Sequence, residues 1–261
     1  MLKEYYGSRA KIGVIYMTSG FVLEPEFAAM APKGVSVHYT RIFLPVVTVK
    51  GLAEMMKPGG VERCTRYLAE APLDVIAFGG TSATFLFGMG YDEKIRRRIV
   101  KASGGIPATT TSTAALRALR AVGAKRMALV TPYVDEVTER GRVFFSDNGF
   151  DVVSARGLGI AKDLGIGSVT IRQVYDFTVK SVPKDADSVF LSCTNLRAIG
   201  AIPALEKKLG IPVVSAIQAT MWDCLRLAGV PTKDVKGFGS LFRANASPAR
   251  IEGRRGARRA A

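Results

Sequence analysis

A strand-like segment that occurs twice constrains the fold more than any other feature of this sequence. The stretch DVIAFGGTS at 74–82 aligns position for position with DSVFLSCTN at 187–195, an offset of 113 residues. Each copy is a short apolar run followed by a polar loop, which is typical of a strand buried on both faces of a parallel sheet. Gly80 in the first copy corresponds to Cys193 in the second. The repeat therefore predicts two similar halves, of which only the second carries a thiol at this position.

The duplication extends along most of the chain. Residues 125–133 repeat the opening strand and its loop at an offset of 115, and Gly210-Ile211-Pro212 repeats Gly105-Ile106-Pro107. Strands are expected at 11–16, 35–42, 74–80, 106–109, within 125–133, at 151–155, at 187–192 and after 210. Helices are expected from 24, at 52–68, 92–102, 113–122, 135–148 and 169–182, and after the last strand. This alternation predicts an α/β fold of two similar doubly wound parallel-sheet lobes related by pseudo-twofold symmetry.

The order of the elements also predicts the domain organisation. The last helix of each half follows its last strand, so the chain is expected to cross between lobes near 113 and near 217. Residues 1–113 plus 217–242 then form the first lobe, 114–216 the second, and 243–261 a basic disordered tail. Ligands in such folds bind beyond the carboxyl ends of the strands, so the active site is expected in the cleft between the lobes.

Composition narrows the class of protein. A chain of 261 residues with 48% hydrophobic and 23% charged residues is ordinary for an α/β enzyme. The first residues lack the apolar core of a signal peptide, and no apolar run reaches the length of a membrane span. Three widely spaced cysteines do not indicate a disulfide framework. We therefore expect a cytoplasmic protein without membrane partners.

The formal charge of +15 raises nucleic acid as a possible partner. Six arginines and one acidic residue lie between Arg243 and the C-terminus, which is typical of a disordered basic tail. A second cluster at 94–101 has no interleaved aromatic residues on which bases would stack. Nucleic-acid binding is therefore not expected as the main function. The positive charge could instead attract a small anionic substrate.

Cys193 is the sharpest candidate for chemistry. A thiol has a pKa of about 8.5 unless its surroundings shift it, so at neutral pH it is mostly an acid. Beside backbone amides at a helix N-terminus it could instead be a thiolate nucleophile. The plain alternative is a small buried hydrophobe, and that role is expected for Cys64 and Cys224 inside amphipathic helices.

Polar residues follow both repeated strands and are candidates for substrate binding. Thr81, Ser82, Thr194 and Asn195 supply donors that could cap the following helices or bind a carboxylate together with free backbone amides. Gly80 allows a ligand to approach the backbone closely, with an ordinary tight turn as the alternative. Tyr133 would place a phenol at the mouth of the second lobe, unless it is a surface tyrosine.

The sequence gives no indication of a metal or cofactor. His38 is the single histidine, so an imidazole-based metal site is excluded, and no cluster of Cys, Asp or Glu replaces it. Neither a dinucleotide-binding glycine motif nor a phosphate loop is present. His38 is expected to have a structural role at the edge of a sheet, although pairing with Cys193 is open. Cofactor-free chemistry is therefore expected.

These motifs resemble those of a known group. Two α/β lobes with a cysteine position after the third strand of each resemble the aspartate/glutamate racemase superfamily. The segments KIGVI at 11–15, EPEF at 24–27 and MAPKGVSVH at 30–38 are similar to the branch that holds maleate cis-trans isomerases and arylmalonate decarboxylases. The resemblance covers the chain to about residue 240.

Departures from each pattern distinguish the possible reactions. The isomerase pattern has Pro-Ser-Ser-Asn-Thr after the first strand, whereas residues 17–21 read MTSGF, so the substrate-contacting asparagine is missing. The isomerase nucleophile, the first-lobe cysteine, falls on Gly80. Racemases need two acid/base groups, and this chain would have one. Decarboxylases of the branch carry Gly-Thr-Ser in the first lobe and a lone cysteine in the second, as Gly80-Thr81-Ser82 and Cys193 do, although Thr194 replaces a smaller residue.

The resemblance implies a cofactor-independent decarboxylase of a malonate-like dicarboxylic acid. Thr81, Ser82, Tyr133 and amides near Cys193 and Thr194 would bind one carboxylate as an enediolate in a dioxyanion hole. The departing carboxylate would lie against apolar groups, expected from Leu44-Pro45 and the 157–160 loop. The alternatives are isomerisation of maleate, a racemase reaction of the same superfamily, or a non-catalytic protein that binds small acids. Oligomeric state does not follow from the sequence.

Overall fold

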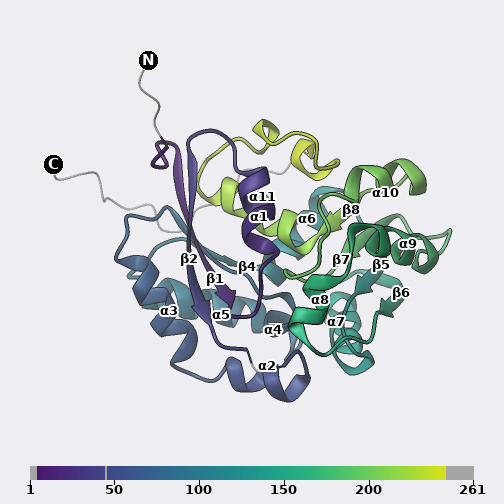
Figure 1. The fold of residues 1–261 in the computed structure, drawn as a ribbon, viewed down its shortest axis with the longest axis horizontal. Coiled ribbons are helices and arrows are strands. Elements are labelled where there is room, and N and C mark those ends of the chain that lie inside the picture. The colour runs from purple at the N-terminus through teal and green to yellow at the C-terminus, as the bar shows by residue number, and fades with distance from the viewer. Residues whose placement is uncertain (1–4, 45, 245–261) are drawn as a thin grey trace.

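The computed structural model describes residues 5–44 and 46–244, which form two four-stranded parallel sheets (Figure 1). The first sheet has the order β2-β1-β3-β4 and contains β1 (Ala10–Met17), β2 (Val35–Ile42), β3 (Val75–Phe78) and β4 (Ala108–Thr110). The second has the order β6-β5-β7-β8 and contains β5 (Arg126–Thr131), β6 (Asp151–Gly157), β7 (Ser188–Leu191) and β8 (Val213–Ser215). All neighbouring strands pair in parallel, so the predicted fold class is confirmed.

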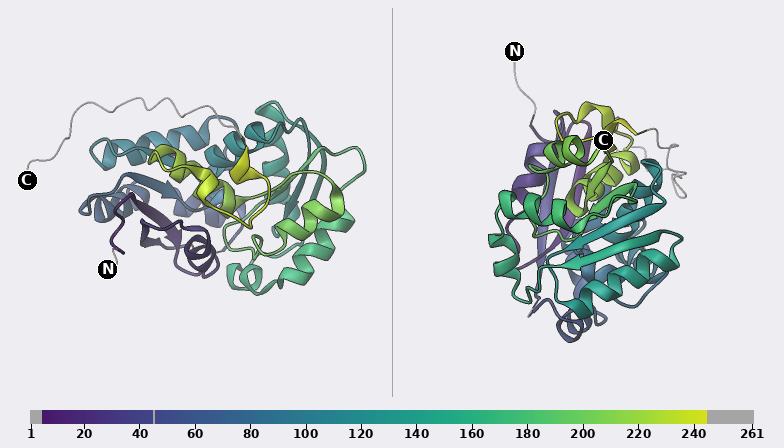
Figure 2. Two further views of the ribbon diagram at one scale, coloured as in Figure 1. Left: turned by 90° about the horizontal axis from the view of Figure 1, so that it is seen from above. Right: turned by 90° about the vertical axis from the view of Figure 1, so that its right-hand side faces the viewer.

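Helices connect the strands and cover both faces of each sheet. In chain order they are α1 (Leu23–Met30), α2 (Val49–Met55), α3 (Gly60–Ala69), α4 (Thr81–Phe85), α5 (Tyr91–Ala102), α6 (Thr111–Ala121), α7 (Asp135–Asp147), α8 (Asp163–Ser168), α9 (Ile171–Ser181), α10 (Ile202–Leu209) and α11 (Ala216–Leu227), followed by short 3-10 turns at Thr232–Asp234 and Leu241–Arg243. Figure 2 shows the two halves side by side, coloured purple to blue and teal to green. We call the part built on the sheet β1–β4 the first lobe and the part built on the sheet β5–β8 the second lobe.

The repeated strands occupy the same position in each sheet. Both β3 and β7 are buried along their whole length, and each pairs with the central strand that opens its lobe. Parallel strands covered on both faces need such continuous apolar runs. The carboxyl ends of β3 and β7 consequently carry the two loops of interest, one per lobe.

Two local predictions are corrected by the structure. The helix expected over 52–68 is two helices, α2 and α3, because Pro58 and Gly59 interrupt it and Gly59 has a φ of 105°. Three helices, α4, α8 and α10, were not expected. They have five, six and eight residues, so hydrophobic periodicity is too short to reveal them.

Helices α6 and α11 pack against each other between the two sheets (Figure 1). The Thr220 hydroxyl of α11 donates to the Thr111 hydroxyl of α6 at 3.2 Å. Asp223, fully buried, accepts hydrogen bonds from Thr109 and Arg117 at 2.7 and 2.8 Å. These contacts link the last elements of both halves. The division into 1–113 plus 217–242 and 114–216 stays a prediction, and residues 245–261 of the predicted tail lie outside the described residues.

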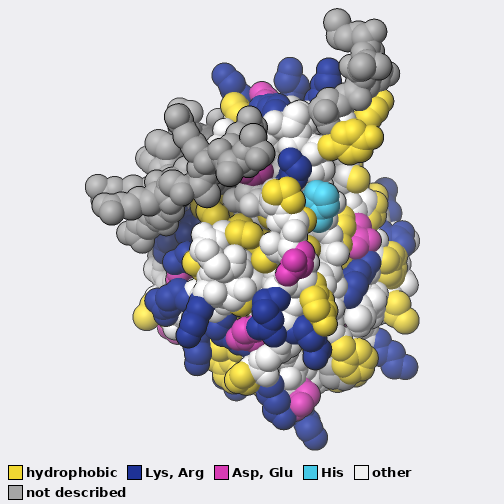
Figure 3. Space-filling model, turned by 90° about the vertical axis from the view of Figure 1, so that its left-hand side faces the viewer, with side chains coloured by type: hydrophobic (Ala, Val, Ile, Leu, Met, Phe, Trp, Pro, Cys, Tyr) yellow, Lys and Arg dark blue, Asp and Glu magenta, His cyan; other side chains and the backbone are white. Residues whose placement is uncertain are grey.

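The surface carries charges of both signs. On the face that shows the β2 edge, lysine and arginine side chains are spread among acidic ones, and His38 lies at the surface (Figure 3). His38 Nε2 is 3.0 Å from Ser36 Oγ on the same edge strand. In the 94–101 cluster, Arg98 binds Glu62 and Arg96 binds Glu93, both at 2.6 Å. Across the described residues, no helix has the length and apolar character needed to cross a membrane.

Candidate active site

The loops after β3 and β7 meet at a small cavity between the lobes. Its lining comes from both halves of the chain and comprises Tyr16, Met17, Leu44, Val47, Leu52, Met55, Gly80, Thr81, Ser82, Ala83, Tyr133, Asp163, Cys193, Thr194 and Asn195. All seven residues predicted for the site are in this set. The cavity leaves about 20 Å³ for the centre of a water molecule, which is room for about one water. A ligand larger than one water molecule would therefore fit only if the surrounding groups moved apart.

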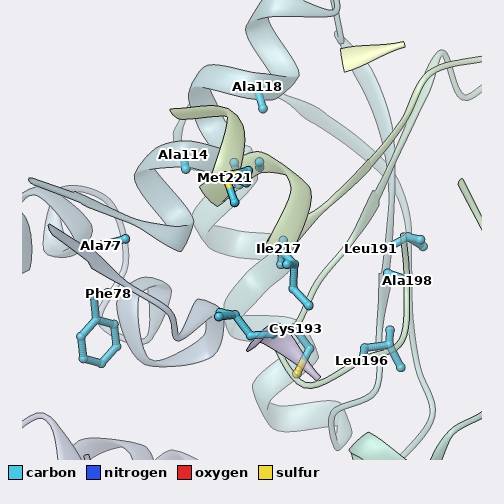
Figure 4. Close-up of a cluster of buried hydrophobic side chains, with 14 of the residues drawn as sticks. Ala77, Phe78, Ala114, Ala118, Leu191, Cys193, Leu196, Ala198, Ile217 and Met221 are labelled. Carbon is cyan, nitrogen blue, oxygen red and sulfur yellow. The ribbon is translucent and has the colours of Figure 1, made fainter. Parts of the chain in front are cut away.

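Cys193 lies two residues after the end of β7, in a conformation rare for a side chain other than glycine. Its φ is 128°, the one positive value among the described non-glycine residues. Such backbone strain persists only where the surroundings enforce it, and it gathers at functional sites. The thiol is buried and belongs to a cluster of apolar side chains that includes Leu196 and Ile217 (Figure 4).

The environment of Cys193 keeps its thiol protonated. Burial raises the pKa of the Cys193 thiol to about 12, and the negative charge of Asp163 acts in the same direction. The backbone N–H of Asn195 donates to Cys193 Sγ at 3.3 Å, which favours the thiolate once it forms. At neutral pH this arrangement is that of a proton donor rather than a standing nucleophile.

Gly80 faces the cavity from the opposite lobe and leaves little space for a side chain. A Cβ atom added at Gly80 would lie 2.8 Å from Met17 Cε and 2.8 Å from Phe78 Cε1. The methionine end can move aside, whereas the ring of Phe78 is fully buried. The asymmetry predicted between Gly80 and Cys193 is therefore built into the packing around them.

Hydroxyl groups from both lobes surround the cavity. Thr81 Oγ1 is buried and has no hydrogen-bond partner among the described residues. Such an orphaned group is costly and needs a reason. Burial raises the pKa of Tyr133 well above its usual value, and its phenol lies close to Cys193, Ser192 and Ser82. The neutral phenol is thus a donor within the same small space.

The hydroxyl-bearing residues do not cap helices, which was one of the two predicted roles. Helix α4 begins at Thr81 itself, and its N-cap residue, Gly80, offers no side chain. No helix starts after Thr194 until Ile202. The reason is that the chain after β7 runs through ten irregular residues, 192–201, which we call the cysteine loop.

Thr194 and Asn195 tie the cysteine loop to the first lobe. Thr194 Oγ1 donates to Gly79 O at 2.7 Å. Asn195 Oδ1 accepts from the backbone N–H groups of Phe21 and Val22 at 3.1 and 3.3 Å, while Asn195 Nδ2 donates to Asp163 O at 2.9 Å. The polar atoms of the Asn195 side chain are already engaged, so its predicted role in substrate binding is less direct than that of Thr81.

Sequence reasoning missed two polar residues of the cavity. The Tyr16 hydroxyl donates to Thr194 O at 2.9 Å, and burial raises the pKa of Tyr16 far above its usual value. Asp163 Oδ2 accepts from Ser19 Oγ at 2.6 Å, across the two lobes. Tyr16 was detectable as a phenol at the end of an otherwise apolar strand. Nothing in the sequence marked Asp163, because it begins helix α8, which was not predicted.

The apolar side of the cavity is partly as expected. Leu44 lines it, together with Val47, Leu52 and Met55, and Val47 N donates to Ala161 O of the second lobe at 3.0 Å. Pro45 lies outside the described residues, and the 157–160 loop does not line the cavity; Asp163 does instead. The loop turns back onto β5 and its end, with Leu158 N bonded to Thr131 O and Ile160 N to Pro132 O.

Two other features of the molecule do not offer an alternative site. A larger hollow of about 930 Å³ lies between α1 and β2. Its lining contains none of the predicted site residues, and it is mostly apolar groove at the sheet edge. Within 5–44 and 46–244 no group of three His, Cys, Asp or Glu side chains is placed to hold a metal ion. Cys193 therefore remains the candidate for chemistry.

Known proteins resemble this chain over most of its length. Residues 13–242 match the family model described as arylmalonate decarboxylase. The arylmalonate decarboxylase of Bordetella bronchiseptica is 37% identical over 179 residues, which cover 68% of this chain and 74% of that protein. The maleate isomerase of Nocardia farcinica is 29% identical over 242 residues, or 89% of this chain and 95% of that protein.

The similar solved structures come from the same two groups of enzymes. A liganded double variant of arylmalonate decarboxylase superposes with a TM-score of 0.82 at 32% identity, covering 89% of this chain and 98% of that chain. The maleate cis-trans isomerase of Nocardia farcinica bound to TRIS gives a TM-score of 0.84 at 27% identity, covering 90% and 98%. Both groups of relatives are enzymes. The chain belongs to the arylmalonate decarboxylase family.

Proposed function

We propose that the protein is a cofactor-independent decarboxylase of a malonate-like dicarboxylic acid. The observation that carries this proposal is the single protonated thiol of Cys193 opposite Gly80, where no side chain is present. One acid on one face of a carbon atom suits protonation of a carbanion from one side. A racemase would require a second acid/base group on the opposite face.

The retained carboxylate of the substrate would bind among Thr81, Ser82 and Tyr133. The unpaired hydroxyl of Thr81 supports this placement, because a carboxylate oxygen would satisfy it. Donors aimed at the oxygen atoms on which charge develops contribute most of the rate in such reactions. Backbone N–H groups beside Cys193 and Thr194 would complete the dioxyanion hole.

The reaction would proceed in two balanced steps. First, the bond between the α-carbon and the departing carboxylate breaks, CO2 leaves, and the electron pair moves onto the retained carboxylate to give an enediolate. Next, the S–H bond of Cys193 breaks and its proton forms a C–H bond at the α-carbon, leaving a thiolate. Asn195 N–H stabilises that thiolate until solvent reprotonates it.

The departing carboxylate would lie against Leu44, Val47 and Met55. Transfer of a carboxylate to an apolar wall removes its hydration and favours the loss of its charge as CO2. These side chains are buried and line the cavity beside Gly80. The apolar wall thus favours cleavage of the bond nearest to it.

Isomerisation of maleate is the second candidate, and its support is the structural likeness to maleate isomerases. Addition of a sulfur nucleophile to a double bond requires a thiolate. Burial holds the pKa of Cys193 at about 12, which disfavours a standing thiolate. The first-lobe position that would supply a second cysteine is Gly80. The decarboxylase is therefore favoured, and a non-catalytic acid-binding protein has no observation in its favour.

Product analysis separates the two reactions directly. The purified protein should release CO2 from a 2-aryl-2-methylmalonate and give one enantiomer of the 2-arylpropionate, because protonation comes from one side. Evolved CO2 and chiral chromatography measure both. Fumarate formed from maleate, without CO2 from any malonate, would instead establish the isomerase. Binding of either acid without turnover would contradict both enzymes.

The pH dependence of turnover should follow the raised pKa of Cys193. The protonated thiol is the active form, so its contribution is lost only as pH rises through about 12. We expect kcat to change less than about twofold between pH 7 and 9.5, whereas a thiol at the ordinary pKa of about 8.5 would lose about tenfold. A pH–rate profile checks this. A basic limb near pH 8.5 would contradict the assigned protonation.

A further inference from the structure

The cysteine loop is held in shape mainly from outside itself. Within residues 192–201 the described backbone hydrogen bonds include Ala201 N to Ala198 O, and Asn195 N reaches Cys193 Sγ. No helix follows β7 directly, in contrast to α4 after β3. A loop with so few internal bonds does not by itself maintain Cys193 at a φ of 128°.

The first half of the loop is held by β1, β3 and the start of α1. Tyr16 binds the Thr194 carbonyl, Thr194 binds Gly79 O, and Asn195 accepts the N–H groups that precede α1. These partners belong to the first lobe, while Ser192 N donates to Val130 O and Asn195 Nδ2 to Asp163 O within the second lobe. The position of Cys193 therefore depends on groups across the cavity.

The second half of the loop is held by one buried carboxylate, Glu26 of α1. Glu26 Oε1 accepts from Ala198 N at 2.9 Å and from Ile199 N at 3.3 Å. The side chain shares the apolar face of α1 with Leu23 and Phe27, and Glu26 is 8% exposed. Desolvation by burial raises the pKa of the Glu26 carboxyl to about 7.

The burial of the Glu26 carboxyl group is energetically costly. Glu26 Oε2 is buried without a hydrogen-bond partner among the described residues. A carboxyl group on an apolar helix face with one unpaired oxygen is destabilising compared with leucine or methionine. What the residue supplies is a fixed acceptor for two loop amides that have no acceptor within the loop.

We propose that Glu26 is a positioning residue for Cys193, holding the far end of the cysteine loop on α1 so that the thiol keeps its strained orientation toward the cavity. This inference rests on the proposed role of Cys193 as proton donor. The effect is conveyed through the backbone of 193–199, since Glu26 itself does not line the cavity. A purely structural tie between the lobes is the alternative that the experiment must exclude.

Three variants at position 26 test whether Glu26 positions the cysteine loop. Glu26→Gln keeps an oxygen acceptor, Glu26→Asp keeps the carboxyl group but is one methylene too short to hold both amides, and Glu26→Ala removes the acceptor. We expect kcat for the malonate substrate to fall about 10- to 100-fold in the Asp and Ala variants, with KM changed less than about threefold, because a small misplacement of a reacting group is that costly. Glu26→Gln should stay within about threefold of the parent.

A second readout does not depend on turnover. The rate of Cys193 alkylation by iodoacetamide, measured by peptide mass spectrometry, should rise at least about tenfold in Glu26→Asp and Glu26→Ala, as the released loop exposes the thiol. Cys64 and Cys224 are buried in helices and serve as internal references for global unfolding. If no malonate is turned over but the alkylation pattern holds, the proposed function fails while the positioning role stands.

Asp92→Ala is the matched control. Asp92 is a buried carboxylate of the first lobe, 3% exposed, that accepts from Thr113 at 2.6 Å and does not contact the cysteine loop. Its loss should lower the melting temperature without changing kcat or Cys193 alkylation. Equal kcat and equal alkylation in Glu26→Asp and the parent would overturn the proposal. So would effects in Asp92→Ala that match those of Glu26→Ala at the same residual stability.

Discussion

Replacing Cys193 by alanine is expected to lower kcat for the malonate substrate about 10³-fold, because a positioned general acid contributes about 10²- to 10⁴-fold. Alanine keeps the Cβ atom, so the backbone strain at a φ of 128° is retained and the cavity is enlarged by one sulfur only. Residual decarboxylation by the carboxylate-binding groups should persist, with protonation by water. The product should then lose its single-handedness, which chiral chromatography measures alongside CO2 release.

The two other cysteines provide matched controls for this substitution. Cys64 and Cys224 are buried in α3 and α11, and neither lines the cavity. Alanine at either position should reduce stability by about 1 kcal/mol or more, as removal of a buried group does, and leave kcat unchanged. Full turnover of every malonate and maleate by the Cys193→Ala variant would remove the proposed mechanism.

The Gly80→Cys substitution should place a thiol on each face of the substrate α-carbon, where the parent protein has one thiol on one face. The added thiol would face Cys193 across the substrate, so the α-proton of a 2-aryl or 2-alkyl acid can be removed on one face and replaced on the other. We expect the enantiomeric excess of the product to fall strongly, and an enantiopure acid to racemise. Incorporation of deuterium at the α-carbon in heavy water measures the same exchange.

The packing around Gly80 sets the cost of this change. The new Cβ would press on Met17 and on the ring of Phe78, and overpacking of this kind typically costs about 1–3 kcal/mol. Gly80→Ser is the matched control, since it adds nearly the same volume without a thiol and should not racemise. Combining Gly80→Cys with Cys193→Ser should favour the opposite enantiomer. Unchanged product handedness in both cysteine variants would place Gly80 away from the reacting carbon.

Much of the site was predictable because the repeat marks where strands end. The apolar runs before Gly80 and Cys193 identify buried parallel strands, and the polar residues after them must lie at the carboxyl edges of the sheets. The repeat predicted six residues that line the cavity: Gly80, Thr81, Ser82, Cys193, Thr194 and Asn195. Tyr133 was predicted from the repeat of the opening strand and also lines it. The contacts that these residues make were not predictable, because their partners lie in the other lobe.

Tertiary contacts add roles that no local pattern indicates. Asn195 lines the cavity as expected, and its side chain also binds the backbone ahead of α1. Glu26 was visible as an acid between Leu23 and Phe27 on one helix face, but its partners lie more than 170 residues away. Long-range pairs of this kind leave no local pattern. The 52–68 helix was mispredicted because Pro58 and Gly59 outweigh an otherwise continuous helical periodicity.

The sequence by itself determined the two-lobed α/β fold, the polar loops at the ends of two corresponding strands, and a thiol at only one of those two strand ends. These follow from local patterns: apolar runs, turn residues and a repeat of 113 residues. Only the tertiary structure decided the protonation and orientation of that thiol. Burial raises the pKa of Cys193 to about 12, and groups of the opposite lobe surround the loop in which its positive φ occurs. Desolvation and strain are properties of the assembled surroundings, which no single segment encodes.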